Sequence, residues 1–293
     1  MPVYKVFTWN MQRGQSISRQ DATIRERYQV LMDLVNWADF GFITEPGKDI
    51  RDNLNNFYLP HLQRHFCASQ MFDNQTDASA CRPVVYSKTA FSRIPPTTEE
   101  YISYLSGADQ AYRYPAAGIV TLPQDDGQGN NELLLLSFHA TSGYNANENC
   151  QAYFDSFYRF DTRKRDSPPI PLLWIVGGDF NCNAGRAIYM PASSTHQSDH
   201  ILDGFFADQN GTNFQVTQMA AAQTWNQTNG GPGQFVIHAI VGPRGYVVNG
   251  NHLSDHCPVF AQLQIERLPE DVDMDTANIV TGKRKRRQSK RYY

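Results

Sequence analysis

Short apolar runs that each end at a polar or charged residue are the feature that most constrains this chain. Five such runs end at Asn10, at Glu45, at His139, at Asp179 with Asn181, and at Asp255 with His256. Apolar runs of about four to eight residues, bounded by turn residues, are typical of buried strands. A single polar residue after a strand is usually an ordinary loop residue, so the five together carry the information. The pattern predicts a layered sandwich of strands with a site along one edge.

The rest of the chain reads as many strands and few helices. Strands are expected at residues 3–9, 40–45, 84–87, 116–122, 133–139, 171–176, 235–241 and 257–265. Apolar residues at helical spacing predict helices over residues 23–38 and 147–160. Residues 184–232 are rich in Gly, Asn, Gln, Ser and Thr, and this composition predicts long loops. The body of the chain is therefore expected to be one domain, residues 1–268.

The C-terminal tail, residues 269–293, is acidic and then basic and has no hydrophobic periodicity, which predicts disorder. Five consecutive cations form a cluster typical of nuclear localisation signals: Lys283, Arg284, Lys285, Arg286 and Arg287. The cluster predicts a nuclear location and a nuclear import receptor as partner. The alternative is a solvated basic tail that only raises non-specific affinity for DNA.

Charge and apolar content limit the classes of partner. The tail holds seven of the 26 basic and four of the 29 acidic residues, so residues 1–268 carry a net charge of about −6. Such a body does not coat nucleic acid through bulk charge, and any DNA contact is expected from a local site or from the tail. No apolar run approaches the ~18 residues of a membrane span, and the N-terminus has no apolar core of a secretion signal. We therefore expect no membrane insertion, although a signal that had been removed would leave no trace.

The five cysteines are an odd number and include no Cys-x-x-Cys pair, which argues against a disulfide framework and a structural zinc site. Free buried thiols are expected, and one bridge between Cys67 and Cys81 stays open.

Four local stretches and the order of the five polar strand ends resemble a known superfamily. The stretches are Thr8–Gln12, Arg113–Ile119, Phe138–Gly143 and Trp174–Asn181. From Thr8 to Phe260 the chain resembles the endonuclease/exonuclease/phosphatase superfamily, and within it the chain is most similar to the nuclease subunit of cytolethal distending toxins. The resemblance implies an α/β fold, a four-layer α/β/β/α sandwich of the DNase I type. It also implies a metal-dependent phosphodiesterase that hydrolyses DNA.

Hard oxygen ligands suit Mg²⁺, and the sequence offers carboxylates and an amide rather than thiols. Glu45 is the best primary metal ligand, with Asn10 beside it and Asp255 as a further ligand. Mg²⁺ is the expected ion, with Mn²⁺ or Ca²⁺ as alternatives. The metal would neutralise and orient the attacked phosphate.

The resemblance also assigns roles to the other polar residues. His256 acts at the attacked phosphate, Asp179 aligns the water or the leaving group, His139 is an acid or a phosphate clamp, and Asn181 binds a phosphate oxygen. Imidazole suits such roles because its unperturbed pKa is near neutrality. The sequence leaves open which histidine is the acid and which is the base.

One departure concerns the residue that orients His256. Members of the superfamily place an Asp for this purpose on the strand before the Ser-Asp-His segment, and here that position holds His238, or Ile237 if the alignment slips by one. A neutral His238 can accept a hydrogen bond but brings no negative charge. Asp203, in Ile201-Leu202-Asp203-Gly204, resembles the missing motif but lies earlier in the chain, so it is the alternative.

Arg82 and Arg113 fall where the toxin nucleases carry arginines that contact DNA, and guanidinium groups bind phosphate in a bidentate fork. Ordinary surface arginines are the alternative.

For the whole chain, the leading hypothesis is a DNase that acts in a nucleus, with toxin delivery subunits as further partners. It competes with two other hypotheses. One is a phosphoinositide phosphatase or lipid phosphodiesterase with the same site, and the other is a catalytically weakened DNA-binding homologue.

Overall fold

The computed structural model describes part of the chain. The described residues are 3–12, 22–46, 65–68, 83–92, 115–123, 132–140, 173–181, 188–189, 191, 195–196, 200–207, 212–221, 246–248 and 251–267. The expected helix at 147–160, the expected strand at 235–241 and the tail at 269–293 lie outside these ranges. So do Arg82, Arg113, His238 and the basic cluster at 283–287, so their predicted roles stay predictions.

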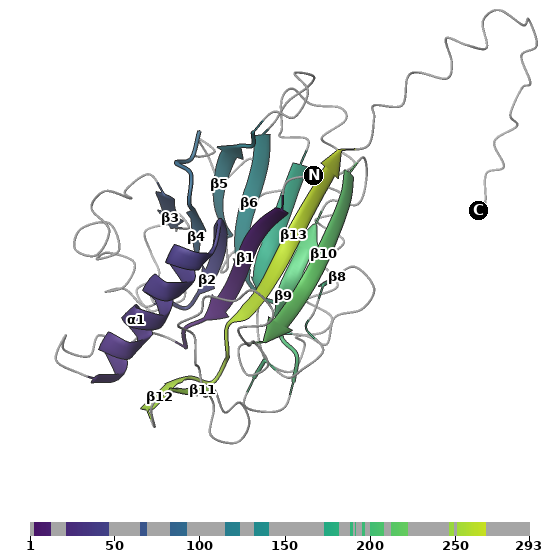
Figure 1. Ribbon diagram of the computed structural model, residues 1–293. Helices are drawn as coiled ribbons and strands as arrows, with labels where there is room; N and C mark the ends of the chain where they lie inside the picture. The colour runs from purple at the N-terminus through teal and green to yellow at the C-terminus, as the bar shows by residue number, and fades with distance from the viewer. Residues whose placement is uncertain are drawn as a thin grey trace, which may run out of the picture.

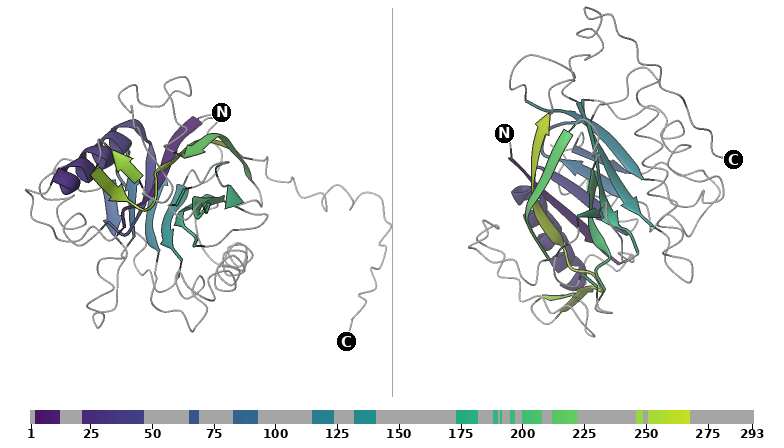
Figure 2. Two further views of the ribbon diagram at one scale, coloured as in Figure 1. Left: turned by 90° about the horizontal axis from the view of Figure 1, so that it is seen from below. Right: turned by 90° about the vertical axis from the view of Figure 1, so that its right-hand side faces the viewer.

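Two mixed β-sheets face each other (Figures 1 and 2). The first sheet has six strands in the order β10-β13-β1-β2-β4-β3. They are β1 Val3–Asn10, β2 Phe40–Thr44, β3 Phe66–Ala68, β4 Val84–Ser87, β10 Thr212–Ala221 and β13 Val259–Arg267. β1 runs parallel to β2 and antiparallel to β13.

The second sheet has five strands in the order β5-β6-β7-β9-β8. They are β5 Ala116–Thr121, β6 Glu132–His139, β7 Leu173–Asp179, β8 Ile188–Tyr189 and β9 Asp203–Ala207. β6 and β7 are parallel, and β9 is antiparallel to β7. A separate hairpin joins β11 Tyr246–Val248 to β12 Asn251–Ser254.

Helix α1, Ala22–Trp37, lies on the outer side of the first sheet (Figure 2). Leu31, Leu34 and Val35 are buried, as their helical spacing predicts. Trp37 meets Phe260 of β13 edge to face at 5.3 Å between ring centroids. The described part therefore supplies one helical layer and both sheets of the sandwich. No helix within the described ranges is long and apolar enough to cross a membrane.

The main core fills the space between the sheets. Alternate residues of a strand point to the same face, and the inward residues are apolar on both sheets, for example Val6, Phe42, Leu135, Ile175 and Phe205. Burial of such side chains contributes roughly 1.5–3 kcal/mol each, so this core fixes the spacing of the sheets.

Two sequence expectations were wrong in detail. Residues 184–232 were expected to be long loops, but they contain β8, β9 and β10. Polar composition hid these strands. β9 pairs with β7, β10 pairs with β13 and β8 pairs with β9, and no local sequence pattern reports such pairings. The strand expected to end at Val176 continues as β7 to Asp179. Gly177 and Gly178 pair within this strand. Both positions need glycine, because a Cβ at residue 177 would overlap the Phe42 ring and one at residue 178 the carbonyl oxygen of Phe138.

Candidate active site

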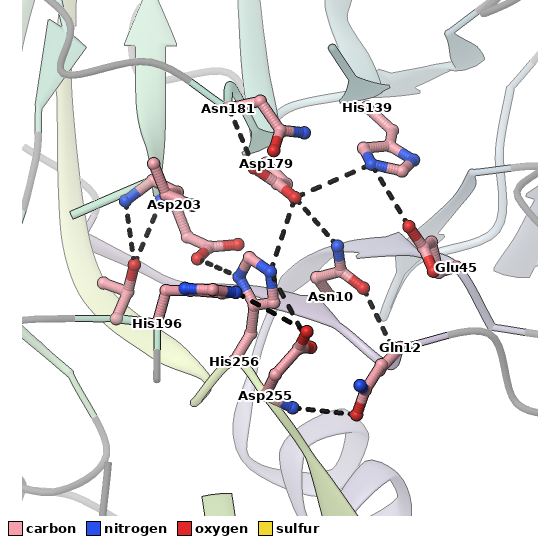
Figure 3. A network of polar contacts seen from close by, with 12 residues as sticks. Asn10, Gln12, Glu45, His139, Asp179, Asn181, His196, Asp203, Asp255 and His256 are labelled. Atoms are coloured by element: carbon pink, nitrogen blue, oxygen red, sulfur yellow. Dashed lines mark hydrogen bonds and ion pairs between the residues drawn. The ribbon is translucent and has the colours of Figure 1, made fainter. Parts of the chain in front are cut away.

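The polar residues at the strand ends meet at one end of the space between the sheets, as the sequence predicted (Figure 3). On β1 the inward positions run Val6, Thr8 and Asn10, so the amide is the last core position of that strand. The same alternation ends β6 at His139 and β7 at Asp179. The parallel pairs β1–β2 and β6–β7 bring their carboxyl ends to this edge, and β9 and β13 start there because they run antiparallel.

Asp179 is at the centre of the site and is 1% exposed. Its Oδ2 accepts a hydrogen bond from Asn10 Nδ2 at 2.8 Å, and its Oδ1 accepts one from the backbone N–H of Asn181 at 2.9 Å. The same Oδ2 lies 3.6 Å from His139 Nε2 and 3.7 Å from His256 Nε2. Asp179 therefore joins the two histidines across the gap between the sheets.

Burial raises the pKa of Asp179 from its ordinary 3.8 to about 6, against the lowering effect of the positive charge on His256. The carboxyl group thus titrates close to neutral pH, so a small change in its surroundings alters its protonation. Such shifted carboxyl groups are frequent in catalytic sites.

His256 is oriented by Asp203. Its Nδ1 lies 2.7 Å from Asp203 Oδ2, and both side chains are buried. Burial alone would lower the pKa of His256, but the negative charges of Asp203 and Asp179 outweigh it and raise the pKa to about 10. The imidazole is therefore protonated at neutral pH, with Nδ1–H donating to Asp203 and Nε2–H directed toward Asp179.

Within the described part of the chain, Asp203 therefore takes the orienting role that the sequence assigned first to His238 and second to Asp203. Asp203 ranks lower from sequence because it lies earlier in the chain than the strand before the Ser-Asp-His segment and is followed by a long polar stretch. Asp203 is the first residue of β9 and pairs with Asp179 of β7 in the sheet register. The local signal was present in the apolar run Phe205-Phe206-Ala207 that follows it.

Glu45 and His139 form the opposite side of the site. Glu45 Oε1 lies 3.4 Å from His139 Nε2, and the Glu45 side chain is 15% exposed. Asn181 Nδ2 donates to Ala140 O at 2.9 Å, which fixes its amide beside this pair. Glu45 and Asn181 both have left-handed backbones, with φ of 47° and 50°. Strain of this kind is common where a turn must aim a side chain at a functional site.

Asp255 is held on the other side. Its backbone N–H donates to Gln12 Oε1 at 3.0 Å, and Gln12 has a left-handed backbone with φ of 47°. Ser254 Oγ donates to Asn10 O at 2.8 Å and so ties the Ser-Asp-His segment to the end of β1. The pKa of Asp255 is lowered: burial would raise it, but a hydrogen bond from His196 and the charge of His256 outweigh this.

His196 and Thr195 also belong to this region, although no local sequence pattern predicts either of them. Thr195 Oγ1 accepts hydrogen bonds from the backbone N–H groups of Leu202 at 2.9 Å and Asp203 at 3.3 Å. His196 forms a β-bridge with His256. They occur in a polar stretch without periodicity, so only the fold reveals their place.

The donor set suits a divalent cation. Four carboxylates, from Glu45, Asp179, Asp203 and Asp255, face two central histidines, so the site carries surplus negative charge that a cation would offset. Among the described residues, two groups have three donor atoms within 4.8 Å of one another: His196 with Asp255 and His256, and Asp179 with Asp203 and His256. Neither contains Glu45, and one lone pair of the Asn10 amide oxygen is already used by the N–H of Gln12.

The fold is that of the endonuclease/exonuclease/phosphatase proteins. A protein of that family from Bacteroides thetaiotaomicron matches with a TM-score of 0.54 at 13% identity, over 92% of this chain and 99% of its own. The human Nocturnin catalytic domain matches with a TM-score of 0.53 at 11% identity, over 90% and 95% of the two chains. D. rerio TDP2 matches with a TM-score of 0.52 at 13% identity, over 90% and 100%.

No family model matches the chain, and no curated protein matches its sequence. The likeness to the solved structures, all below 25% identity, therefore establishes the fold, an α/β sandwich of the DNase I type.

Proposed function

We propose that the chain is a divalent-metal-dependent phosphodiesterase that hydrolyses DNA. The observation that carries the proposal is the arrangement around Asp179, with His139 on one side and the Asp203–His256 pair on the other. Hydrolysis of a phosphodiester requires positive charge at the phosphate, a proton acceptor for the water and a group that stabilises the leaving oxygen. These three kinds of group are present in one buried site on a fold that phosphodiesterases use.

Glu45 and Asp255 would hold the metal ion, because their carboxylates are partly exposed whereas those of Asp179 and Asp203 are buried and hydrogen-bonded. Asn10 can contribute its amide oxygen. A bound Mg²⁺ neutralises and orients the phosphate. Oxygen-rich donors favour Mg²⁺, with Mn²⁺ and Ca²⁺ as alternatives.

The other steps of the proposed hydrolysis are assigned to side chains of the protein. Protonated His256 donates from Nε2 to a phosphate oxygen, and Asp203 holds it in that orientation. Asp179, with its pKa near 6, aligns the attacking water and accepts its proton. His139 clamps the phosphate or protonates the leaving oxygen, and Asn181 binds a phosphate oxygen with the second hydrogen of its amide.

DNA is the favoured substrate for two reasons. The motifs of the chain resemble the nuclease subunit of cytolethal distending toxins, and one structural neighbour, D. rerio TDP2, was solved in complex with a single-strand DNA product. Arg82 and Arg113 are proposed to contact the DNA backbone. The domain of residues 1–268 would be followed by a tail, residues 269–293, that a nuclear import receptor binds. We therefore propose that the protein acts in a nucleus. Toxin-type delivery subunits would first bring it into the cell.

A catalytically weakened DNA-binding protein is now less favoured. That hypothesis rested on the lack of a carboxylate to orient His256, and Asp203 supplies one. A phosphoinositide phosphatase or lipid phosphodiesterase would use the same site, and no described residue favours it over DNA. The two substrate classes therefore become arms of one experiment.

The test is supercoiled-plasmid nicking by the purified full chain in Mg²⁺, with and without EDTA, beside phosphatidylinositol phosphate and sphingomyelin hydrolysis. Asp179→Asn is the control for a contaminating nuclease, because the contaminant would persist in that preparation. We expect nicking that requires the metal and disappears in the variant. Lipid hydrolysis without nicking would contradict the choice of DNA, and no hydrolysis of any substrate would contradict the enzyme itself.

A further inference from the structure

His196 lies beside the site and has no part in the proposed hydrolysis. Its Nε2 lies 3.5 Å from Asp255 Oδ2, and its ring meets that of His256 edge to face at 4.5 Å between centroids. His256 Nε2 lies 3.9 Å from Asp255 Oδ1. Two imidazole nitrogens and one carboxylate oxygen thus converge on one point, all within 4.8 Å of one another (Figure 3).

We propose that His196, Asp255 and His256 form a transition-metal site, best suited to Zn²⁺, that shuts off the proposed hydrolytic site when it is filled. The donor set separates this site from the oxygen ligands expected for Mg²⁺. Imidazole nitrogen prefers Zn²⁺, Cu²⁺ or Ni²⁺, whereas Mg²⁺ prefers carboxylate, carbonyl and water. Two imidazole nitrogens and one carboxylate are also a donor set of catalytic zinc sites that keep a water in the fourth position.

The geometry needs little adjustment. Ligand atoms bound at the usual zinc distances of about 2.0–2.2 Å lie roughly 3–3.5 Å apart, so side-chain shifts of about 1 Å close the site. The backbone around it is already fixed, because His196 is bridged to His256 and the N–H of Asp255 is held by Gln12. The side chains of His196 and Asp255 are 17% and 19% exposed, so an ion can reach them from solvent.

The contact between Asp203 and His256 gives independent support for a metal ion at this site. A histidine that binds a metal usually donates its other ring N–H to a carboxylate, which fixes the ring and strengthens the ligand. His256 has this partner, since Nδ1 lies 2.7 Å from Asp203 Oδ2. Its Nε2 is therefore on the open side of the ring, 3.7 Å from Asp179 Oδ2 and 3.9 Å from Asp255 Oδ1. The backbone N–H of Asp203 in turn donates to Thr195 Oγ1, and Thr195 is the residue before His196. Thr195 therefore links the segment that carries His196 to the carboxylate that orients His256.

Filling this site has a chemical consequence. With zinc bound, His256 would coordinate through Nε2 after releasing the Nε2 proton to solvent, so it could no longer donate to the phosphate, and Asp255 would be drawn away from the Mg²⁺ site. The binding of zinc does not depend on the proposed function, but the inhibition rests on it. The two parts are therefore measured separately.

Binding is tested by calorimetric titration of Zn²⁺ into the metal-stripped full chain in excess Mg²⁺. We expect His196→Gln and Asp203→Asn to weaken binding of one ion at least about tenfold, because loss of a supporting group alone costs roughly 10–100-fold. His65→Gln is the matched control: His65 is a partly buried histidine at the far edge of the first sheet whose Nδ1 pairs with Ser87 O. Unchanged zinc affinity in His196→Gln would overturn the site.

A second variant guards against simple misfolding. His196→Cys places a thiolate, itself a good ligand, at the same position. With Co²⁺ as the probe, we expect a thiolate-to-cobalt charge-transfer band in the near ultraviolet that the wild-type chain lacks. A folded His196→Cys chain without this band would show that position 196 does not bind the ion.

Inhibition is tested by Mg²⁺-dependent plasmid nicking over a Zn²⁺ series. Each variant is normalised to its own activity without zinc. We expect the zinc concentration for half inhibition to rise at least about tenfold in His196→Gln, in step with the lost affinity. Zinc binding without inhibition would overturn the regulatory part, whereas zinc binding by a chain that hydrolyses nothing would count against the proposed function alone.

Discussion

Replacing Asp203 by Asn tests the central pair of the proposed mechanism. Asn keeps the shape of the side chain but removes the negative charge 2.7 Å from His256 Nδ1. If the amide oxygen faces Nδ1–H, its NH₂ group is buried at the position of Asp203 Oδ1, which has no hydrogen-bond partner among the described residues. If the NH₂ group faces Nδ1 instead, the imidazole is forced into the other tautomer and is neutral. In both cases the protonated, oriented His256 is lost.

The expected loss of turnover follows from the interaction between Asp203 and His256. Coulomb attraction at 2.7 Å is about 6 kcal/mol for an effective dielectric constant of 20, and most of it offsets the dehydration of the buried groups. A hydrogen bond to a charged group retains a net contribution of roughly 1.5–3 kcal/mol. At about 1.4 kcal/mol for each factor of ten, turnover should fall roughly 10- to 150-fold.

The assay is the initial rate of plasmid nicking in Mg²⁺, with thermal unfolding of each variant measured alongside. Asp39→Asn is the control for loss of a hydrogen-bonded carboxylate away from the site, because Asp39 Oδ2 accepts the N–H of Lys5 at 2.8 Å. It should lose stability without losing turnover. His238→Asn tests the residue that the sequence analysis preferred, and it should nick at the wild-type rate. Wild-type turnover in Asp203→Asn, together with a large loss in His238→Asn, would refute the reasoning.

Three further outcomes are expected. Glu45→Gln should reduce Mg²⁺-dependent nicking by orders of magnitude with an unchanged unfolding midpoint, and full activity in EDTA would contradict a metal role. In metal-free protein, the raised pKa of His256 contributes stability that is complete below pH 6.5 and is lost as the pH rises toward about 10, so chemical denaturation should show a decline in that window that His256→Gln reduces. Removing residues 283–293 should abolish nuclear accumulation of a fluorescent fusion and leave nicking largely intact; nuclear retention of the truncated fusion would refute the targeting role.

Much of the fold and site could be predicted because several signals are local. An apolar run that ends in a polar residue marks a strand end, and alternation assigns that residue to the inward face, as for Asn10, His139 and Asp179. The spacing of Leu31, Leu34 and Val35 likewise predicts the buried face of α1. The buried free thiol of Cys257 also agrees with the expectation from the cysteine pattern.

The tertiary structure alone decided which carboxylate orients His256. Asp203 and His256 are separated by 53 positions in the chain, and they meet because β9 and β13 begin at the same edge of two facing sheets. The polar residues around β9 conceal the strand in sequence, since its burial comes from pairing with β7 rather than from its own composition. The same long-range packing places His196 beside Asp255. Sequence thus determined which side chains end the strands, whereas the packing of the two sheets determined which of these side chains contact one another.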